Sequence, residues 1–248
     1  MLDGLTHGVV ILPRTDWGDR VYRAFESELQ LLGGTVVGSQ FFDRNKRDFR
    51  GPVTAALLID ESNAREAALE RIIGSKLEFQ PRARADIEFI FVGAEPAQGR
   101  LLRPAIKFYL LDQTPVYSTS DIYEPDATAN ADLDGIIFPD MPWLLAPDEQ
   151  SIQLRASLNR YWPGRARERG RLYALGFDTF RLIPILLSQS SDTPTTQANG
   201  VTGRLTINST GRVYRDLQWA KIVNGRPRLL GTAAVATEPA PTAANAGP

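Results

Sequence analysis

A group of carboxylate, hydroxyl and indole side chains directly follows the apolar runs that are typical of β-strands. The carboxyl ends of parallel strands meet at one edge of a sheet, so these side chains are expected to line one crevice and to hold a small polar ligand there. Alternatively, the tryptophans pack under loops and the hydroxyls cap helices or turns. The candidate residues are Asp16, Trp17, Glu95, Ser118, Ser120, Asp140 and Trp143.

The amino-acid composition restricts the catalytic and cofactor chemistry that is open to this chain. The chain has no cysteine, which excludes disulfides and thiolate nucleophiles, and its single histidine, His7, leaves little for a zinc site or an acid-base dyad. It contains no G-x-G-x-x-G, P-loop or G-x-S-x-G motif. The sequence therefore predicts no cofactor and no enzyme activity. A carboxylate-based hydrolase would need two acids that face each other in the crevice, and the sequence places none there.

One segment imitates half of a calcium-binding loop. Asn130, Asp132 and Asp134 alternate along the chain, as oxygen ligands do in such loops. The twelfth position, which should be a bidentate glutamate, is Met141. A solvated acidic turn before a strand is the favoured interpretation, and no metal is expected.

A second acidic pair lies at the start of an expected strand. The alternation of side chains along a strand puts Asp86 and Glu88 on one side. Because Arg82 and Arg84 are adjacent and this is the amino end of the strand, surface ion pairing is favoured over catalysis.

The charge balance excludes one class of partner. With 248 residues, a formal net charge of -1 and a pI near 6.0, the chain has no basic footprint for nucleic acid. The basic runs at 44–50 and 165–171 are expected to be solvated faces, with a partner surface as the alternative. No run reaches the ~20 apolar residues that span a bilayer. The start of the chain lacks the features of a signal peptide, so taken alone the chain looks cytoplasmic.

Apolar strands alternate with helical patterns through the first part of the chain. Thr15 or Asp16 is expected to cap the first helix, and Gly33 and Gly34 to end it. Ser62 is expected to cap a later helix, and Gly74 to end that one. This order predicts βαβ crossovers and an open parallel sheet. The expected strands are 9–12, 35–42, 87–92, 115–119 and 136–138, and the helical stretches begin at 15–16, 53, 62 and 96.

The segment from Asp134 to Leu145 carries the most specific pattern. A short buried strand should end at Phe138, because Pro139 and Pro142 cannot donate backbone hydrogen bonds. Trp143 is then expected where the chain leaves the sheet.

The pattern changes after Leu145. Helices are predicted over 151–161 and 165–187, an exposed loop over 188–199, a small antiparallel β module over 200–223, and disorder over 231–248. Pro184 should kink the longer helix. One face of that helix is expected to carry Leu172, Leu175, Leu182, Ile183 and Leu186.

Several motifs resemble, in the same order, the C-terminal domain of the LpoA (LppC) family, outer-membrane lipoproteins that activate peptidoglycan synthases. D-M-P-W-L-L from Asp140 is the most specific of them. The others are D-W-G from Asp16, L-G-G-T from Leu32, R-A-D-I-E-F-I-F from Arg84, R-L-L-R-P from Arg100, P-V-Y-S-T-S from Pro115, R-L-Y-A-L-G-F-D-T-F-R-L from Arg171 and G-V-T-G-R-L from Gly200.

The resemblance implies an α/β fold of the type I periplasmic-binding-protein kind, with two lobes joined by crossover strands. Residues 1–135 would form the second lobe, 136–230 a crossover with helices and a β module of a partly missing first lobe, and 231–248 a disordered tail. The opening units of the first lobe, the signal peptide and the lipidated cysteine of the family have no counterpart here. We therefore expect a C-terminal fragment or a late start, with apolar surface exposed where the missing strands belong.

The implied function is that of a non-catalytic regulator that binds a class A penicillin-binding protein and stimulates peptidoglycan cross-linking. The family works on the periplasmic side of the outer membrane, which this chain would reach only through a lipid anchor that it lacks. The alternative is a periplasmic solute-binding protein for an amino acid or a sugar fragment. No nucleic acid and no cofactor are expected as partners.

Overall fold

The computed structural model describes residues 4–110, 114–125, 128, 130–187, 195–208 and 211–231. Its centre is a seven-stranded sheet in the order β10-β9-β5-β4-β3-β1-β2, and neighbouring pairs from β2 to β5 are parallel. The parallel strands are β1 (His7–Pro13), β2 (Thr35–Phe42), β3 (Phe89–Val92), β4 (Val116–Ser118) and β5 (Ile136–Asp140). The predicted parallel α/β sheet is confirmed.

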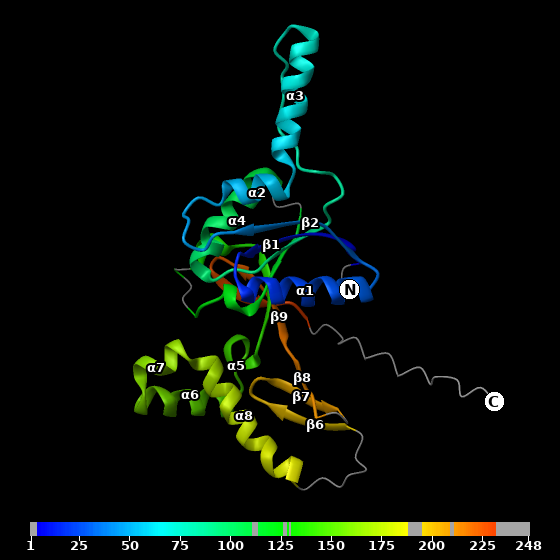
Figure 1. The fold of residues 1–248 in the computed structure, drawn as a ribbon. Helices are drawn as coiled ribbons and strands as arrows, with labels where there is room; N and C mark the ends of the chain where they lie inside the picture. The colour runs from blue at the N-terminus through cyan, green and yellow to red at the C-terminus, as the bar shows by residue number, and fades with distance from the viewer. Residues whose placement is uncertain are drawn as a thin grey trace, which may run out of the picture.

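Helices cover both faces of this sheet (Figure 1). On β1, Val9 and Ile11 pack into a core with α2 and α4, whereas Val10 and Leu12 pack toward α1 on the other face. Alternating side chains that are all buried are typical of a parallel strand covered on both sides. The helices of this unit are α1 (Asp16–Leu31), α2 (Arg50–Ala56), α3 (Ile59–Ile73) and α4 (Pro96–Leu110), with two short 3₁₀ turns, η1 (Ser120–Ile122) and η2 (Ala131–Leu133).

Local helix signals were mostly predicted correctly. The Thr15 hydroxyl accepts a hydrogen bond from the Gly18 amide at 3.1 Å, and Gly74 ends α3 with a φ of +75°. The predicted cap at Ser62 is wrong, because α3 begins at Ile59 after a left-handed turn at Leu58. Ser62 is buried inside the helix, where its hydroxyl accepts a hydrogen bond from the Arg82 amide.

β5 is longer than predicted. It continues through Pro139 to Asp140, and these residues lie opposite Trp219 and Gln218 of β9 (Gln218–Val223). Its last pair with β4 is at Ile137, so Pro139 has a ladder on only one side. A strand tolerates proline where one edge is unpaired, which explains why the predicted end at Phe138 is wrong.

The predicted antiparallel module is divided between two sheets. β9 and β10 (Arg226–Leu229) extend the large sheet beside β5, whereas β6 (Thr195–Gly200), β7 (Gly203–Asn208) and β8 (Val213–Asp216) form a separate sheet. Residues 195–199 are therefore a strand and not the predicted loop. The rest of that loop, 188–194, and the tail from 232 lie outside the described residues.

The second sheet and the helices beside it form a smaller unit below the large sheet in the view of Figure 1. It contains α5 (Pro142–Leu145), α6 (Glu149–Tyr161), α7 (Pro163–Glu168) and α8 (Gly170–Leu187). The helix predicted over 165–187 is thus broken at Arg169, whereas Pro184 lies inside α8. β5 carries the chain from the large sheet into this unit, and β9 returns it.

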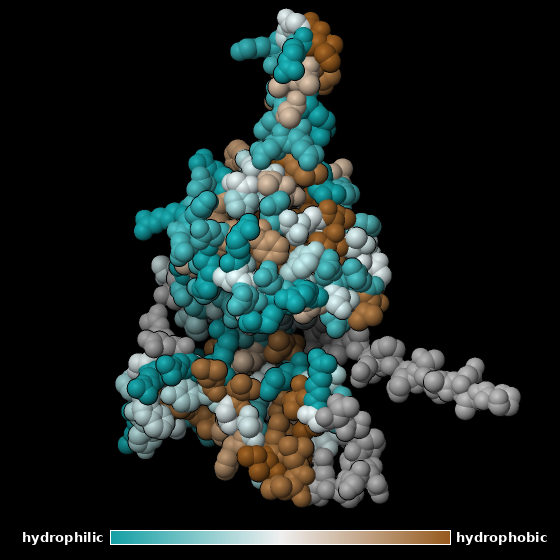
Figure 2. Space-filling model, in the orientation of Figure 1, coloured by the Kyte–Doolittle hydropathy of each residue, from teal (hydrophilic) through white to brown (hydrophobic). Residues whose placement is uncertain are grey.

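The inward face of α8 carries two charged residues among apolar ones. Arg171, Ala174, Asp178 and Leu182 follow each other at helical spacing on the side that packs against the rest of the unit. The opposite face is apolar and turned to solvent, and the space-filling view shows this end of the molecule largely brown (Figure 2). Its exposed residues are Leu172, Leu175, Phe180, Ile183, Leu186 and Leu187.

The expectation that Leu182 shares a face with Leu172 is therefore wrong, since Leu182 is 8% exposed and Leu172 is 63% exposed. Exposed apolar side chains gather on α8. That this surface lies where the missing strands belong stays a prediction. Within the described residues, none of the helices combines the length and apolar character that crossing a bilayer requires.

We predict that the apolar face of α8 binds a hydrophobic fluorescent dye. Replacing Leu172 and Phe180 by glutamine should lower the dye signal and change the free energy of unfolding by less than about 0.5 kcal/mol, because both side chains are exposed. Leu182→Ala is the matched control, and it should cost about 2–5 kcal/mol. Undiminished dye binding by the double variant would contradict the assignment.

Candidate functional site

An ion pair joins the end of β5 to α8. The Asp140 carboxylate is 1% exposed and accepts hydrogen bonds from Arg171 Nη2 at 2.5 Å and Nε at 3.2 Å. The Met141 amide donates to the same carboxylate at 2.8 Å. Arg171 Nη2 also donates to the carbonyl oxygens of Ser120 and Tyr123, each at 3.0 Å. One guanidinium thus ties together the large sheet, the turn after β4 and the smaller unit.

The contacts of Arg171 explain how the Asp140 carboxylate can be buried without a large loss of stability. A carboxylate without a partner would be costly in this position, and Arg171 supplies both a positive charge and a fork of donors. Tyr123 stacks on Phe138 beside the pair, with ring centroids 5.1 Å apart. Burial, and then the charge of Asp140, raises the pKa of Tyr123, so the phenol remains protonated at neutral pH.

Trp143 follows the pair and is an internal packing residue. Its side chain is 2% exposed, and it clusters with Ala174 and Val201. Its amide donates to the Val201 carbonyl oxygen at 3.0 Å, and its own carbonyl oxygen accepts from Arg155 at 3.1 Å. Trp143 therefore anchors α5 between α8 and the turn that joins β6 to β7.

The two candidate serines are used differently. The buried Ser118 hydroxyl donates to the Val92 carbonyl oxygen at 2.6 Å, which links β4 to β3. Ser120 contributes its backbone carbonyl to Arg171. The structure thus brings Ser120, Asp140 and Trp143 together at the junction of the two units.

The other candidates lie elsewhere along the carboxyl ends of the strands. Asp16 is exposed in the first turn of α1, and Trp17 packs against Leu12 beside Gly93. Glu95 forms an ion pair with Arg44. A ligand crevice that gathers all these residues stays a prediction, because their polar groups are divided among separate contacts.

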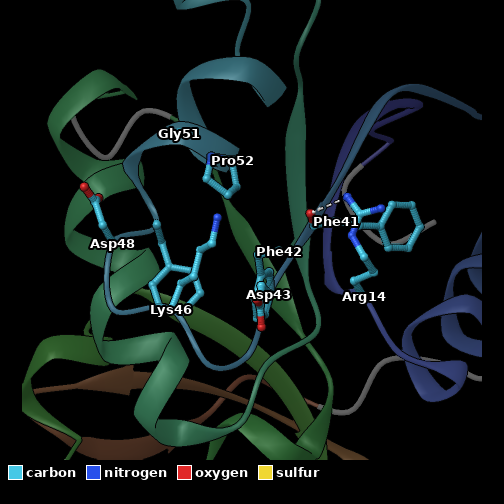
Figure 3. Close-up of a pocket in the computed structure, with 9 residues that line it drawn as sticks. Arg14, Phe41, Phe42, Asp43, Lys46, Asp48, Gly51 and Pro52 are labelled. Atoms are coloured by element: carbon cyan, nitrogen blue, oxygen red, sulfur yellow. Dashed lines mark hydrogen bonds between the residues drawn. The ribbon is translucent and has the colours of Figure 1, made fainter.

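A hollow of about 570 Å³ lies at the carboxyl ends of β1 and β2 (Figure 3). Phe42 and Phe49 pack edge to face with centroids 5.0 Å apart. The Lys46 side chain extends toward Pro52, and Arg14 donates to the Phe41 carbonyl oxygen at 3.4 Å (Figure 3). None of the seven candidate residues lines this hollow.

Side chains of the acidic segment before β5 form hydrogen bonds with backbone groups. The Asp134 carboxylate accepts from the amides of Asn224 and Gly225 at 2.9 and 2.8 Å, which holds the turn between β9 and β10. The Asn130 side-chain amide donates to the Glu124 carbonyl oxygen at 2.6 Å. Among the described residues, no group of three or more acidic, histidine or cysteine side chains could hold a metal ion.

Asp86 and Glu88 also make structural contacts. Asp86 forms two hydrogen bonds of 2.6 Å with Arg84, which lowers the pKa of the Asp86 carboxyl. Glu88 accepts from the backbone amides of Thr6 and His7, and these bonds lower the pKa of Glu88, that from Thr6 most. Ion pairing is confirmed for Asp86, whereas Glu88 is hydrogen-bonded mainly to backbone.

Two residues that make buried contacts in the structure, Arg171 and Asp178, are not among the candidates predicted from the sequence. The sequence pattern predicts that Arg171 belongs to a solvated basic run, whereas in the structure it pairs with Asp140. Asp178 on the same helix face is 1% exposed and accepts from the Val201 and Thr202 amides at 2.9 and 2.8 Å and from the Thr202 hydroxyl at 2.6 Å. Their seven-residue spacing, with Ala174 between them, was the available signal.

The comparisons with known proteins agree with this architecture. A model of the LppC lipoprotein family matches residues 1–225. The chain belongs to this family. The predicted family resemblance is confirmed.

Curated relatives in this family carry the name penicillin-binding protein activator LpoA. The protein from Vibrio antiquarius is 30% identical over 222 residues, which cover 88% of this chain and 36% of the relative. The protein from Vibrio vulnificus is 29% identical over 219 residues, with the same shares covered. The chain therefore spans about a third of the length of these relatives.

Solved structures support the fold. The C-domain of LpoA from Haemophilus influenzae, described as a regulator of PBP1A, matches with a TM-score of 0.61 at 20% identity, covering 92% of this chain and 62% of that one. The leucine-binding protein LivK from Thermotoga maritima matches with a TM-score of 0.55 at 14% identity, covering 92% and 60%. The predicted periplasmic-binding-protein-like fold is confirmed, with its small antiparallel sheet near the carboxyl end.

We predict that the two members of the buried ion pair respond unequally to substitution. Arg171→Met leaves the buried Asp140 carboxylate without a cation and should lower the free energy of unfolding by about 3–5 kcal/mol. Asp140→Asn should cost less, because the Arg171 side chain is 32% exposed and keeps two carbonyl partners. Denaturant unfolding measures both values.

The exposed pair Arg50 and Asp48 provides the control for this prediction. The Arg50 guanidinium lowers the pKa of Asp48 to about 2, yet the two side chains are 77% and 62% exposed. Arg50→Met should therefore lower the free energy of unfolding far less than Arg171→Met does, because water screens the exposed pair. Equal effects of Arg171→Met and Arg50→Met would refute a structural role for the buried pair.

A separate prediction concerns Asp178. Asp178→Leu leaves the Val201 and Thr202 amides without their acceptor and should destabilise the protein by at least about 2 kcal/mol. Hydrogen exchange of these two amides should accelerate more than that of β1 and β3. Thr179→Ala is the control, because Thr179 is exposed and should leave the exchange unchanged.

Proposed function

We propose that this chain belongs to a non-catalytic regulator that binds a class A penicillin-binding protein and stimulates its transpeptidation. Family membership supports this function, together with relatives that are 29–30% identical and are named penicillin-binding protein activators. The identity runs through 88% of this chain, which includes both the large sheet and the smaller unit.

The contacts of the polar side chains at the strand ends carry the proposal. Asp140 is paired with Arg171, the Ser118 hydroxyl is bonded to a backbone carbonyl, and Glu95 is paired with Arg44. Each of these groups already has an internal partner, so a substrate would have to break a structural contact to reach it. Such an arrangement favours recognition through the outer surface over chemistry in the crevice.

The regulator would act on the periplasmic side of the outer membrane. This proposal rests on the LppC lipoprotein family and on the LpoA relatives. A lipid anchor would hold it there, and its contact with the synthase would be made by the folded domain.

Stimulation would follow from preferential binding. A regulator raises the activity of a synthase when it binds the active conformation more tightly than the inactive one. The equilibrium between the two conformations shifts by no more than this difference in binding free energy. A tenfold preference corresponds to about 1.4 kcal/mol. No catalytic group on the regulator is needed.

The same fold also occurs in the leucine-binding protein LivK, so solute binding is the alternative. None of the seven candidate crevice residues lines the hollow at the ends of β1 and β2. Fold similarity alone does not transfer a ligand.

We expect the purified chain to bind a class A penicillin-binding protein from the same organism and to increase the fraction of cross-linked peptides that it forms. Binding is measured by surface plasmon resonance with the chain immobilised. Cross-linking is measured by chromatography of the digested peptidoglycan product. A penicillin-binding protein of another class is the control. Absence of binding by a chain that unfolds cooperatively would refute the proposed function.

Thermal unfolding with a panel of amino acids and cell-wall sugars tests the alternative. A ligand present at about 100 times its Kd would add about 2.7 kcal/mol to the stability of a solute-binding protein. We expect no such shift. A reproducible shift with one compound would favour solute binding over regulation.

A further inference from the structure

The end of α3 is an exposed apolar surface far from the body of the protein. α3 projects away from the large sheet, and the space-filling view shows a brown patch at its end (Figures 1 and 2). The helix ends in Leu69, Ile72 and Ile73, which are 50%, 81% and 56% exposed. We call these three residues the α3 tip.

The structure around the α3 tip fixes its shape. Gly74 ends the helix in a left-handed conformation, and its amide donates to the Glu70 carbonyl oxygen at 2.8 Å. The Leu77 amide donates to the Glu70 carboxylate at 2.9 Å, which holds the returning chain against the helix. The three apolar side chains therefore project from one face at i, i+3 and i+4 spacing.

We propose that the α3 tip inserts into an apolar groove of the penicillin-binding protein. This inference rests on the proposed function and deepens it by naming the surface that makes the contact. Apolar anchors at i, i+3 and i+4 are the pattern by which a helix docks in a groove of another protein. A projecting end fits a concave partner, and burial of these aliphatic side chains would stabilise the complex.

A second copy of this chain fits the α3 tip poorly. Two tips in contact would bury on the order of a few hundred Å² in total, whereas a stable interface buries roughly 800 Å² on each partner. The body of α3 adds little apolar area, because its exposed side chains before Leu69 are mainly polar. A groove that encloses the tip removes more apolar surface from water than an end-to-end contact does.

A lipid surface is also disfavoured. The charged residues around the α3 tip balance, so an anionic membrane would not attract it. Three are basic and three are acidic: Arg65, Arg71 and Lys76, and Glu66, Glu70 and Glu78. Segments that lie in the membrane interface combine basic residues with tryptophan and other large apolar residues. α3 has no aromatic residue. The balanced charge and the aliphatic anchors suit an apolar protein groove.

The test compares Ile72→Asp with Leu31→Asp in the full 248-residue chain. Leu31 ends α1 on the body of the protein and is 77% exposed, so it matches Ile72 in exposure but not in place. Ile72→Asp should weaken binding to the purified class A penicillin-binding protein at least tenfold, and Leu31→Asp should leave it unchanged. Both variants should unfold at the wild-type temperature, since both positions are exposed.

Each other outcome overturns the inference in a distinguishable way. If the wild-type chain binds and Ile72→Asp binds equally well, the proposed function stands and the α3 tip is not its contact. If the wild-type chain does not bind, the proposed function fails and the inference fails with it. Sedimentation velocity and co-sedimentation with phosphatidylglycerol vesicles complete the test. A dimer or a vesicle association that Ile72→Asp abolishes would assign the tip to a second copy or to lipid.

Discussion

The buried ion pair of Asp140 and Arg171 is the constraint on which the arrangement of the two units depends. Asp140 ends the strand that leaves the large sheet, and its carboxylate is almost inaccessible to water. Such a group is stable only with a cation and hydrogen-bond donors beside it. α8 must therefore present Arg171 to the end of β5, and this requirement fixes the position of the helix against the sheet.

The rotation of α8 about its own axis has the same origin. Once Arg171 faces inward, Ala174, Asp178 and Leu182 follow on the same face, because they recur at helical spacing. Asp178 then meets the turn between β6 and β7, and Ala174 meets Trp143. The apolar residues on the opposite face are turned to solvent as a consequence. The inward face thus combines the hydrogen bonds of two charged groups with the apolar contacts of Ala174 and Leu182.

These contacts also bear on function. The fold resembles that of a leucine-binding protein, yet the polar groups at the strand ends are engaged in holding the architecture. A shared fold leaves function to the details of the site. Here those details favour recognition of a protein partner by exposed surface, and the apolar residues of the projecting α3 tip are exposed on the large unit.

Local patterns and the order of motifs were sufficient to predict the parallel strands, the helix end at Gly74, the absence of thiol chemistry and the family. They left the cap of α1 open between Thr15 and Asp16, and the structure shows that it is Thr15. Which strands β9 joins, which face of α8 is buried and what Arg171 binds follow from the folded structure alone. Asp140 and Arg171 are 31 residues apart, and β9 pairs with β5 across a longer separation. A local pattern shows that a side chain is charged or a segment extended, but partners distant in sequence are chosen by the packing of the whole chain.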